Sequence, residues 1–254
     1  MCSTNRGSTR RPQRHRRHDP GRGAGKENVT RDGPAIAISN LEFRYREGDF
    51  VLRIPSLQVA PGETVAVIGP SGTGKTTLLN LVAGVAVPGA GTVRVAGAEV
   101  TALGDTARRA HRIRNIGMVF QEFELISYLD VLDNVLLPYR IDPQLKLDAA
   151  VAEQAAALVS EVGLGDKLRR RVTHLSQGER QRVAIGRALV TGASVLLADE
   201  PTGNLDPRNK ERILDLLFEQ VRSRGVTLVA VTHDHGLLDR FDRVVEFDGL
   251  EVTP

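Results

Sequence analysis

One loop of the sequence has the residue types and the spacing that bind a triphosphate. Glycines let a loop bend so tightly that several backbone N–H groups point at phosphate oxygens. Lys75 can reach the β- and γ-phosphates, and the Thr76 hydroxyl can ligate Mg²⁺. An apolar run precedes the loop and helical spacing follows it, which disfavours an incidental glycine-rich loop. The pattern G-x-x-x-x-G-K-[ST] is formed by Gly69, Pro70, Ser71, Gly72, Thr73, Gly74, Lys75 and Thr76, and Thr77 follows it.

Two adjacent carboxylates, Asp199 and Glu200, end an apolar run that predicts a buried strand over residues 194–200. The carboxyl ends of strands in an open α/β sheet face the ligand crevice. One carboxylate would hold Mg²⁺, directly or through water, and the other would polarise an attacking water molecule. The alternative is a purely structural Asp-Glu pair before Pro201.

Two more polar residues follow predicted buried strands. Gln121 ends the run 116–120, and His233 follows the run 226–231. A histidine at a strand terminus is usually structural. Here it is a further polar group at the same edge of one sheet, which favours a place in the phosphate site.

Tyr45 and Ser176 each have a structural interpretation, and Tyr45 also has a functional one. Tyr45 ends an alternating apolar segment, so it is either a strand-edge aromatic or a ring that stacks on a purine base. Ser176 precedes a predicted helix and Glu179 comes three residues later, which is the spacing of a capping box. The residues alone leave the choice at Tyr45 open.

The elements around these residues predict an α/β fold with a mostly parallel core sheet, an antiparallel β-subdomain and a helical subdomain over about residues 125–175. Alternating apolar residues predict an antiparallel pair over 35–45 and 50–59. Further strands are predicted over 92–95, 116–120, 194–200, 226–231 and 243–247, and helices after the phosphate loop and over 105–114, 148–162 and 206–221.

The composition separates a basic tail from a folded body. The chain has 254 residues, one cysteine and a net charge of +3, and residues 1–34 hold nine basic against three acidic residues. We expect residues 1–33 to be a disordered basic tail and residues 34–254 to form one domain. The single cysteine excludes an internal disulfide framework. No stretch approaches the ~20 consecutive apolar residues of a membrane-spanning helix.

Taken together, these motifs resemble the ATP-binding cassette (ABC) family over residues 35–252. The segment Leu175-Ser176-Gln177-Gly178-Glu179 is similar to the ABC signature, which P-loop kinases and GTPases lack. Gln121, Asp206 and His233 match the Q-loop, the D-loop and the H-switch of the family. Tyr45 matches the aromatic A-loop residue, which favours stacking on adenine.

The resemblance implies a site that is shared between two copies. Two copies would face head to tail around two ATP molecules, with the phosphate loop from one and Ser176 to Glu179 from the other. Thr76, Gln121 and Asp199 would arrange Mg²⁺. Glu200 would orient or deprotonate the attacking water, and His233 would hold the γ-phosphate. The family usually has glycine in place of Gln177, and glutamine would adopt positive φ there only with strain.

The sequence of residues 120–126 and 133–138 looks most similar to the branch of the LolD-, MacB- and FtsE-type ATPases. The resemblance implies an ATPase that drives a separate membrane permease, for export, lipoprotein release or mechanotransmission. Such a subunit is peripheral, on the cytoplasmic face of the inner (plasma) membrane. The alternative is a soluble ABC ATPase that acts on nucleic acid or ribosomes, which only the basic tail favours; no specific nucleic-acid partner is expected.

Overall fold

A computed structural model describes residues 1–2, 33–47, 50–247 and 252–253 of the chain. The chain divides into residues 1–30 and 31–254, and all the described helices and strands belong to the second unit. The predicted disordered tail over residues 1–33 lies, except for residues 1, 2 and 33, outside the described residues.

A five-stranded sheet carries the centre of the fold, and all its pairings are parallel. Its strands β3, β7 and β8 are almost wholly buried, which explains their unbroken apolar runs. In spatial order the strands are β6 (Ile116–Val119), β7 (Val195–Asp199), β8 (Thr227–Val231), β3 (Thr64–Ile68) and β9 (Arg243–Glu246).

A second sheet is antiparallel, and it confirms the pair expected over residues 35–45 and 50–59. The register runs from Ile36 opposite Val59 to Arg44 opposite Val51. The predicted strand over residues 92–95 joins this sheet against β1. In spatial order the strands are β10 (Val252–Thr253), β2 (Val51–Val59), β1 (Ile36–Arg44), β4 (Ala90–Val95) and β5 (Ala98–Glu99).

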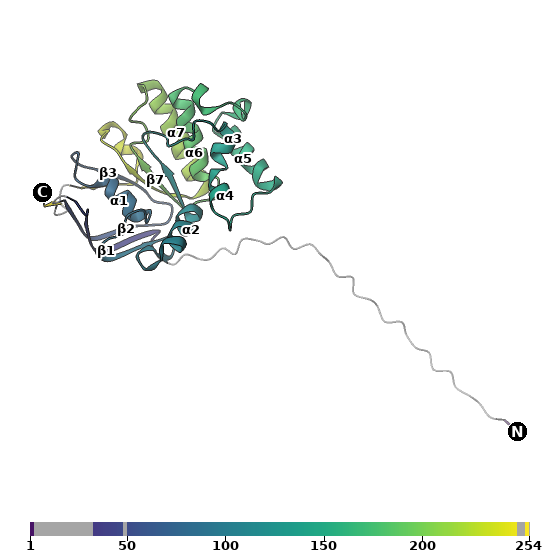
Figure 1. The fold of residues 1–254 in the computed structure, drawn as a ribbon, viewed down its shortest axis with the longest axis horizontal. Helices are drawn as coiled ribbons and strands as arrows, with labels where there is room; N and C mark the ends of the chain where they lie inside the picture. Colours follow the sequence, from purple (N-terminus) through teal and green to yellow (C-terminus); the bar gives the residue numbers. More distant parts are fainter. Residues whose placement is uncertain (3–32, 48–49, 248–251, 254) are drawn as a thin grey trace. The chain divides into compact units, whose positions relative to one another are not determined.

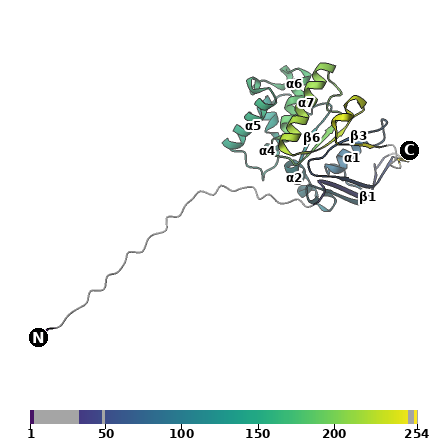
Figure 2. The same cartoon turned by 180° about the vertical axis from the view of Figure 1, so that it is seen from behind.

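Helices cover both faces of the parallel sheet (Figures 1 and 2). Helix α1 (Lys75–Val82) packs between the two sheets, where its leucines share one core with β1 and β3. Helices α6 (Gln177–Leu189) and α7 (Pro207–Arg224) share a second core with the opposite side of β7 and β8. Helix α2 (Asp105–Asn115) has no buried residue.

A third core holds the helical part of the chain together. It joins α3 (Val131–Val135) and α5 (Ala149–Glu161) to the start of α6, and α4 (Leu137–Ile141) follows α3 directly. This core also includes Val183 of α6. Short 3₁₀ turns complete the described elements: η1 (Val100–Ala102), η2 (Gly165–Lys167), η3 (Val172–His174) and η4 (His235–Arg240).

The helix ends follow ordinary capping rules. Asp148 caps α5 by accepting from the Val151 N–H, and Asp206 caps α7 by accepting from the Asn209 N–H. Helix α7 ends three residues later than predicted, because Gly225 supplies the left-handed C-terminal residue at φ 62°.

Gly117 of β6 allows α6 to lie directly on the parallel sheet. A Cβ atom on Gly117 would lie 2.3 Å from the backbone oxygen of Ala188. Backbone cannot move away as the end of a flexible side chain can, so any side chain here would displace α6 from the sheet.

We therefore expect Gly117→Ala to lower the free energy of unfolding by about 2 kcal/mol or more, measured by urea denaturation. The matched control is Gly89→Ala, where the nearest atom to the new Cβ is the Glu42 backbone oxygen at 3.7 Å. That control should stay within about 0.5 kcal/mol of the unmodified chain. Equal losses in the two variants would contradict the close packing of α6 on β6.

Candidate nucleotide-binding site

The polar residues that the sequence predicts at the ends of the buried strands meet at one edge of the parallel sheet. Gln121 follows β6, Asp199 and Glu200 stand at the end of β7, and His233 follows β8. The phosphate loop follows β3, the next strand in the sheet. These residues surround a cavity of about 500 Å³, which is lined by Tyr45, Phe50, Ser71, Gly72, Gly74, Lys75, Thr76, Thr77, Gln121, Asp199, Glu200, Val231 and His233.

The phosphate loop has the backbone form that its glycines permit. Gly72 and Gly74 have φ values of 83° and 96°, in the left-handed region. Gly74 directly precedes α1, and no described side chain caps that helix. Its first N–H groups therefore face the cavity without a side-chain acceptor, as an anion site at a helix N-terminus requires.

Gly69, Pro70 and Thr73 do not line the cavity, but they hold the loop and its lysine in place. The Lys75 ammonium donates to the backbone oxygens of Gly69 and Pro70 at 2.7 and 2.6 Å. The Thr73 hydroxyl donates to the Pro70 oxygen at 2.9 Å. Carbonyls of its own loop thus hold Lys75 within reach of the anion site.

Thr76 and Asp199 form a pair of oxygen ligands. The Thr76 hydroxyl donates to Asp199 Oδ2 at 2.9 Å, although β8 lies between β7, which carries Asp199, and β3, which precedes the phosphate loop. The described residues contain no group of three or more His, Cys, Asp or Glu side chains arranged to hold a metal ion. A hydroxyl oxygen and a carboxylate oxygen are donors that suit a hard cation such as Mg²⁺, which takes few protein oxygens and completes its shell with phosphate oxygens and water.

Glu200 stands in a strained backbone position. Its φ is 47°, which residues with a Cβ adopt rarely. Its N–H donates to the Val231 oxygen at 3.0 Å, and its own oxygen accepts from Gly203 at 3.0 Å. Its carboxylate accepts from His233 Nδ1 at 2.7 Å, and the Glu200 side chain is 17% exposed against 73% for His233. The pair therefore presents one carboxylate oxygen and one ring nitrogen for other partners.

Two aromatic rings flank the mouth of the cavity. The Tyr45 hydroxyl shares a hydrogen bond of 2.9 Å with Thr77 Oγ1. The Tyr45 ring is 5.8 Å from the Phe50 ring, and Tyr45 is 47% exposed. Sequence reasoning missed Phe50, although pairing of Arg44 with Val51 leaves Tyr45 and Phe50 at the same end of the two strands. An exposed Tyr45 ring beside the partly buried Phe50 ring suits the stacking of a base.

The segment after Glu200 is tied to two neighbours that the sequence did not single out. Asn204 Nδ2 donates to the backbone oxygen of Gln121 at 3.0 Å and to Glu122 Oε1 at 3.1 Å. The fully buried Gln181 of α6 donates to the Pro201 oxygen at 2.6 Å. The sequence gives no signal that could have indicated Gln181, because Arg180 and Arg182 flank it and the segment reads as a polar stretch of the helix.

The signature-like segment lies apart from the cavity in a single chain. Ser176, Gly178 and Glu179 line a separate cavity of about 290 Å³ beside α7, and Asp206 serves as the cap of α7. The expectation of strain at Gln177 is wrong. Gln177 is the first residue of α6, and it is absent from the described non-glycine residues with positive φ.

Comparison with known proteins agrees with this geometry. A sequence profile described as ABC transporter matches residues 52–203. The chain belongs to the ABC transporter family. An ABC transporter ATP-binding protein of Mycobacterium tuberculosis is 41% identical over 224 residues, covering 87% of this chain and 90% of the relative. The lipoprotein-releasing system ATP-binding protein LolD of Xanthomonas campestris pv. campestris is 41% identical over 228 residues, covering 87% of this chain and 93% of LolD.

Solved ABC cassettes share the fold. The dimeric ATP-binding cassette MJ0796, in a post-hydrolysis state bound to ADP and Pi, has a TM-score of 0.74 and 30% identity, covering 85% of this chain and 98% of the cassette. The predicted α/β fold of the ABC ATPase type is therefore confirmed. The chain is an ATP-binding subunit of an ABC transporter, similar to the LolD type. No helix in the described part of the chain has the length and apolar character of a membrane span.

The ABC signature segment begins with a complete capping box, as its sequence predicts. Ser176 Oγ accepts from the Glu179 N–H at 3.3 Å, and Glu179 Oε2 accepts from the Ser176 N–H at 2.7 Å. Glu179 also contacts the Lys167 ammonium. The Lys167 ammonium, followed by the Ser176 N–H and hydroxyl, lowers the pKa of Glu179 from 4.5 to about 2.

We expect the ionised Glu179 to stabilise the chain above pH about 4.5 and to lose this effect as the pH falls toward 2, because its folded-state pKa lies below the unfolded value. Glu179→Gln should therefore cost about 1 kcal/mol of unfolding free energy at pH 7. The difference should shrink at acidic pH in urea denaturation. Glu153→Gln, at an exposed position of α5, is the control. A pH-independent difference would exclude the ionic capping box.

Proposed function

We propose that the chain hydrolyses ATP with Mg²⁺ at two sites in a dimer of two copies, and that this drives a separate membrane permease. Each site would combine the 500 Å³ cavity of one copy with the segment from Ser176 to Glu179 of the other. One observation carries the proposal. The cavity gathers the phosphate loop, a pair of cation ligands and the Glu200–His233 pair, yet the signature segment lies outside it.

Within the cavity the residues divide the work of phosphoryl transfer. Lys75 and the N–H groups from Gly72 to Thr76 hold the phosphates, and Tyr45 and Phe50 hold the base. Thr76, Asp199 and Gln121 hold Mg²⁺, which neutralises phosphate charge when bound. A cation besides Lys75 is needed because Asp199 and Glu200 add negative charge beside the phosphates. Most of the catalysis is positioning and charge stabilisation.

Glu200 is the residue that acts on the attacking water. His233 donates to one oxygen of its carboxylate, which leaves the other oxygen to orient or deprotonate water. His233 Nε2 can then contact the γ-phosphate. The strained backbone of Glu200 supports this role, because such strain concentrates at functional sites.

The second copy supplies donors from the start of α6. The Ser176 hydroxyl and the Gly178 N–H stand at a helix N-terminus, where a phosphate is stabilised. Asp206, which caps α7 at the end of the loop from Glu200, would lie at the contact between the copies. The similar cassette MJ0796 is a dimer with ADP and Pi.

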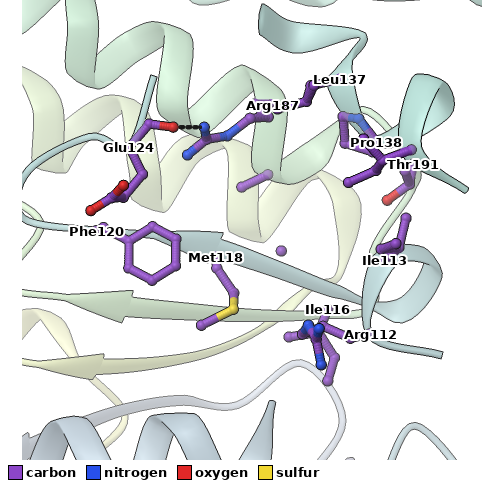
Figure 3. A pocket seen from close by; sticks show the side chains of 13 residues that line it. Arg112, Ile113, Ile116, Met118, Phe120, Glu124, Leu137, Pro138, Arg187 and Thr191 are labelled. Atoms are coloured by element: carbon purple, nitrogen blue, oxygen red, sulfur yellow. Dashed lines mark hydrogen bonds between the residues drawn. The ribbon is translucent and has the colours of Figure 1, made fainter. Parts of the chain in front are cut away.

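A groove between β6, α4 and α6 is suited to the permease. It is a mostly apolar cavity of about 190 Å³ lined by Met118, Phe120, Leu137 and Ile141, among others (Figure 3). Phe120, which lines the groove, directly precedes Gln121 in the chain, so a partner seated there would lie near the nucleotide site. We place the subunit at the cytoplasmic face of the inner membrane, as a peripheral subunit of an export or lipoprotein-release system. The resemblance to LolD supports this branch.

Glu200→Gln should keep ATP binding, lower the turnover number about 100-fold or more and trap an ATP-bound dimer, because the amide cannot take a proton from water. Steady-state phosphate release and size-exclusion chromatography with and without ATP measure these effects. Full ATPase activity in this variant would exclude the assigned role of Glu200.

Lys75→Ala separates binding from hydrolysis. Because it removes the ammonium that reaches the phosphates, it should weaken nucleotide binding itself, measured by titration with labelled ATP. If Lys75→Ala bound ATP normally but failed to hydrolyse it, the division of roles between the loop and Glu200 would need revision.

Tagged full-length chain should copurify with a membrane permease from detergent-solubilised membranes. Introducing charge into the groove with Leu137→Glu should abolish this, whereas Glu153→Gln on the exposed side of α5 should not. Copurification with RNA and no permease would favour the alternative, a soluble ABC ATPase acting on nucleic acid or ribosomes. That alternative rests on the basic tail, most of which lies outside the described residues.

A further inference from the structure

Two consecutive residues just after Gln121 have left-handed backbone. Phe123 has φ 63° and Glu124 has φ 49°. Both carry a Cβ, which makes this conformation unfavourable, and it persists only where other contacts enforce it. Phe123 is 7% exposed, so its ring is fixed in the interior. The contacts that hold this pair must therefore oppose a tendency of the backbone to relax.

Arg187 of α6 supplies those contacts. Its Nη2 donates to the Phe123 oxygen at 2.8 Å, and its Nη1 donates to the Glu124 oxygen. The planar guanidinium fork matches two carbonyls that point in the same direction, and the single ammonium of lysine would not. Arg180, two turns earlier on α6, lies 5.6 Å from the centre of the Phe123 ring. Helix α6 thus clamps both strained residues.

The clamped pair lies between the nucleotide site and the groove. On one side, Gln121 lines the nucleotide cavity, and its backbone oxygen accepts a hydrogen bond from the Asn204 side chain. On the other side, Glu124 and Arg187 both line the groove (Figure 3). A segment seated in the groove would therefore touch the clamp, and a shift of the clamp would move the chain leading to Gln121.

We propose that Arg187 is a positioning residue, which holds Phe123 and Glu124 in left-handed form so that Gln121 reaches the nucleotide site. The inference rests on the proposed function of the nucleotide site. Arg187 itself contacts neither nucleotide nor Mg²⁺ in this scheme, since it is absent from the residues that line the nucleotide cavity.

The first test is Arg187→Lys in the full-length chain, which keeps the charge and removes the fork. The turnover number for ATP should fall on the order of tenfold with KM nearly unchanged, because a misplaced Gln121 affects the reaction more than the binding of ATP. Arg224→Lys on α7, whose Nε donates to Gln220 at 3.0 Å, is the matched control. An unchanged turnover number in Arg187→Lys would overturn the proposal.

Rescue distinguishes positioning from a general role in folding. Glycine adopts positive φ without the Cβ penalty, so Glu124→Gly should restore much of the turnover lost in Arg187→Lys. Glu124→Ala, which also removes the carboxylate but keeps the Cβ, should restore none. If Arg187→Lys does not fold, the same Glu124→Gly change should recover its thermal unfolding transition. Absence of rescue by glycine, or equal rescue by alanine, would overturn the proposal.

Failure of the unmodified chain to bind or hydrolyse ATP would refute the proposed function of the nucleotide site and leave the positioning role of Arg187 as a separate question of backbone geometry.

Discussion

The site depends on one constraint, that a buried parallel strand can carry polar side chains only where it ends. The ladders of β6, β7, β8 and β3 fill their interior with apolar residues. Polar groups therefore stand at or just past the last ladder position, and parallel pairing brings all these ends to one edge. Gln121, Asp199, Glu200, His233 and the phosphate loop meet there because the strands that carry them are neighbours in the sheet.

Strained backbone is concentrated near this edge. Glu200, Phe123 and Glu124 are three of the five described non-glycine residues with positive φ. Each is held by hydrogen bonds to its backbone, Glu200 from within the parallel sheet and the other two from Arg187 of α6. Because these holders lie in packed elements, the core stabilises conformations that the local sequence disfavours. The links between the nucleotide edge and α6 thus pass through positions with little conformational freedom.

The sequence predicts the parts of the site that are determined locally. A strand-to-helix turn with fixed glycines specifies the phosphate loop, and an apolar run that ends in Asp199 and Glu200 specifies the carboxylates. Phe50, Gln181, Asn204 and Arg187 could not be found in the same way. The last three act through side-chain bonds to backbone oxygens far away in the chain, which leave no spacing pattern. The prediction for Gln177 is wrong because its φ is set by its place at the start of α6 and not by a turn that needs glycine.

The capping box sets a condition on any phosphate that reaches Ser176. The Ser176 hydroxyl donates to Glu179 Oε2 at 2.9 Å, and the Ser176 N–H donates to the same oxygen. A phosphate that accepts a hydrogen bond from the Ser176 hydroxyl must therefore displace the hydrogen bond between that hydroxyl and the Glu179 carboxylate. Lys167 contacts the other oxygen, and the Ser176 N–H remains in place, so Glu179 stays paired after the exchange. The negative charge beside the helix N-terminus is thereby balanced within one copy. An incoming phosphate then exchanges one hydrogen bond and meets little uncompensated repulsion.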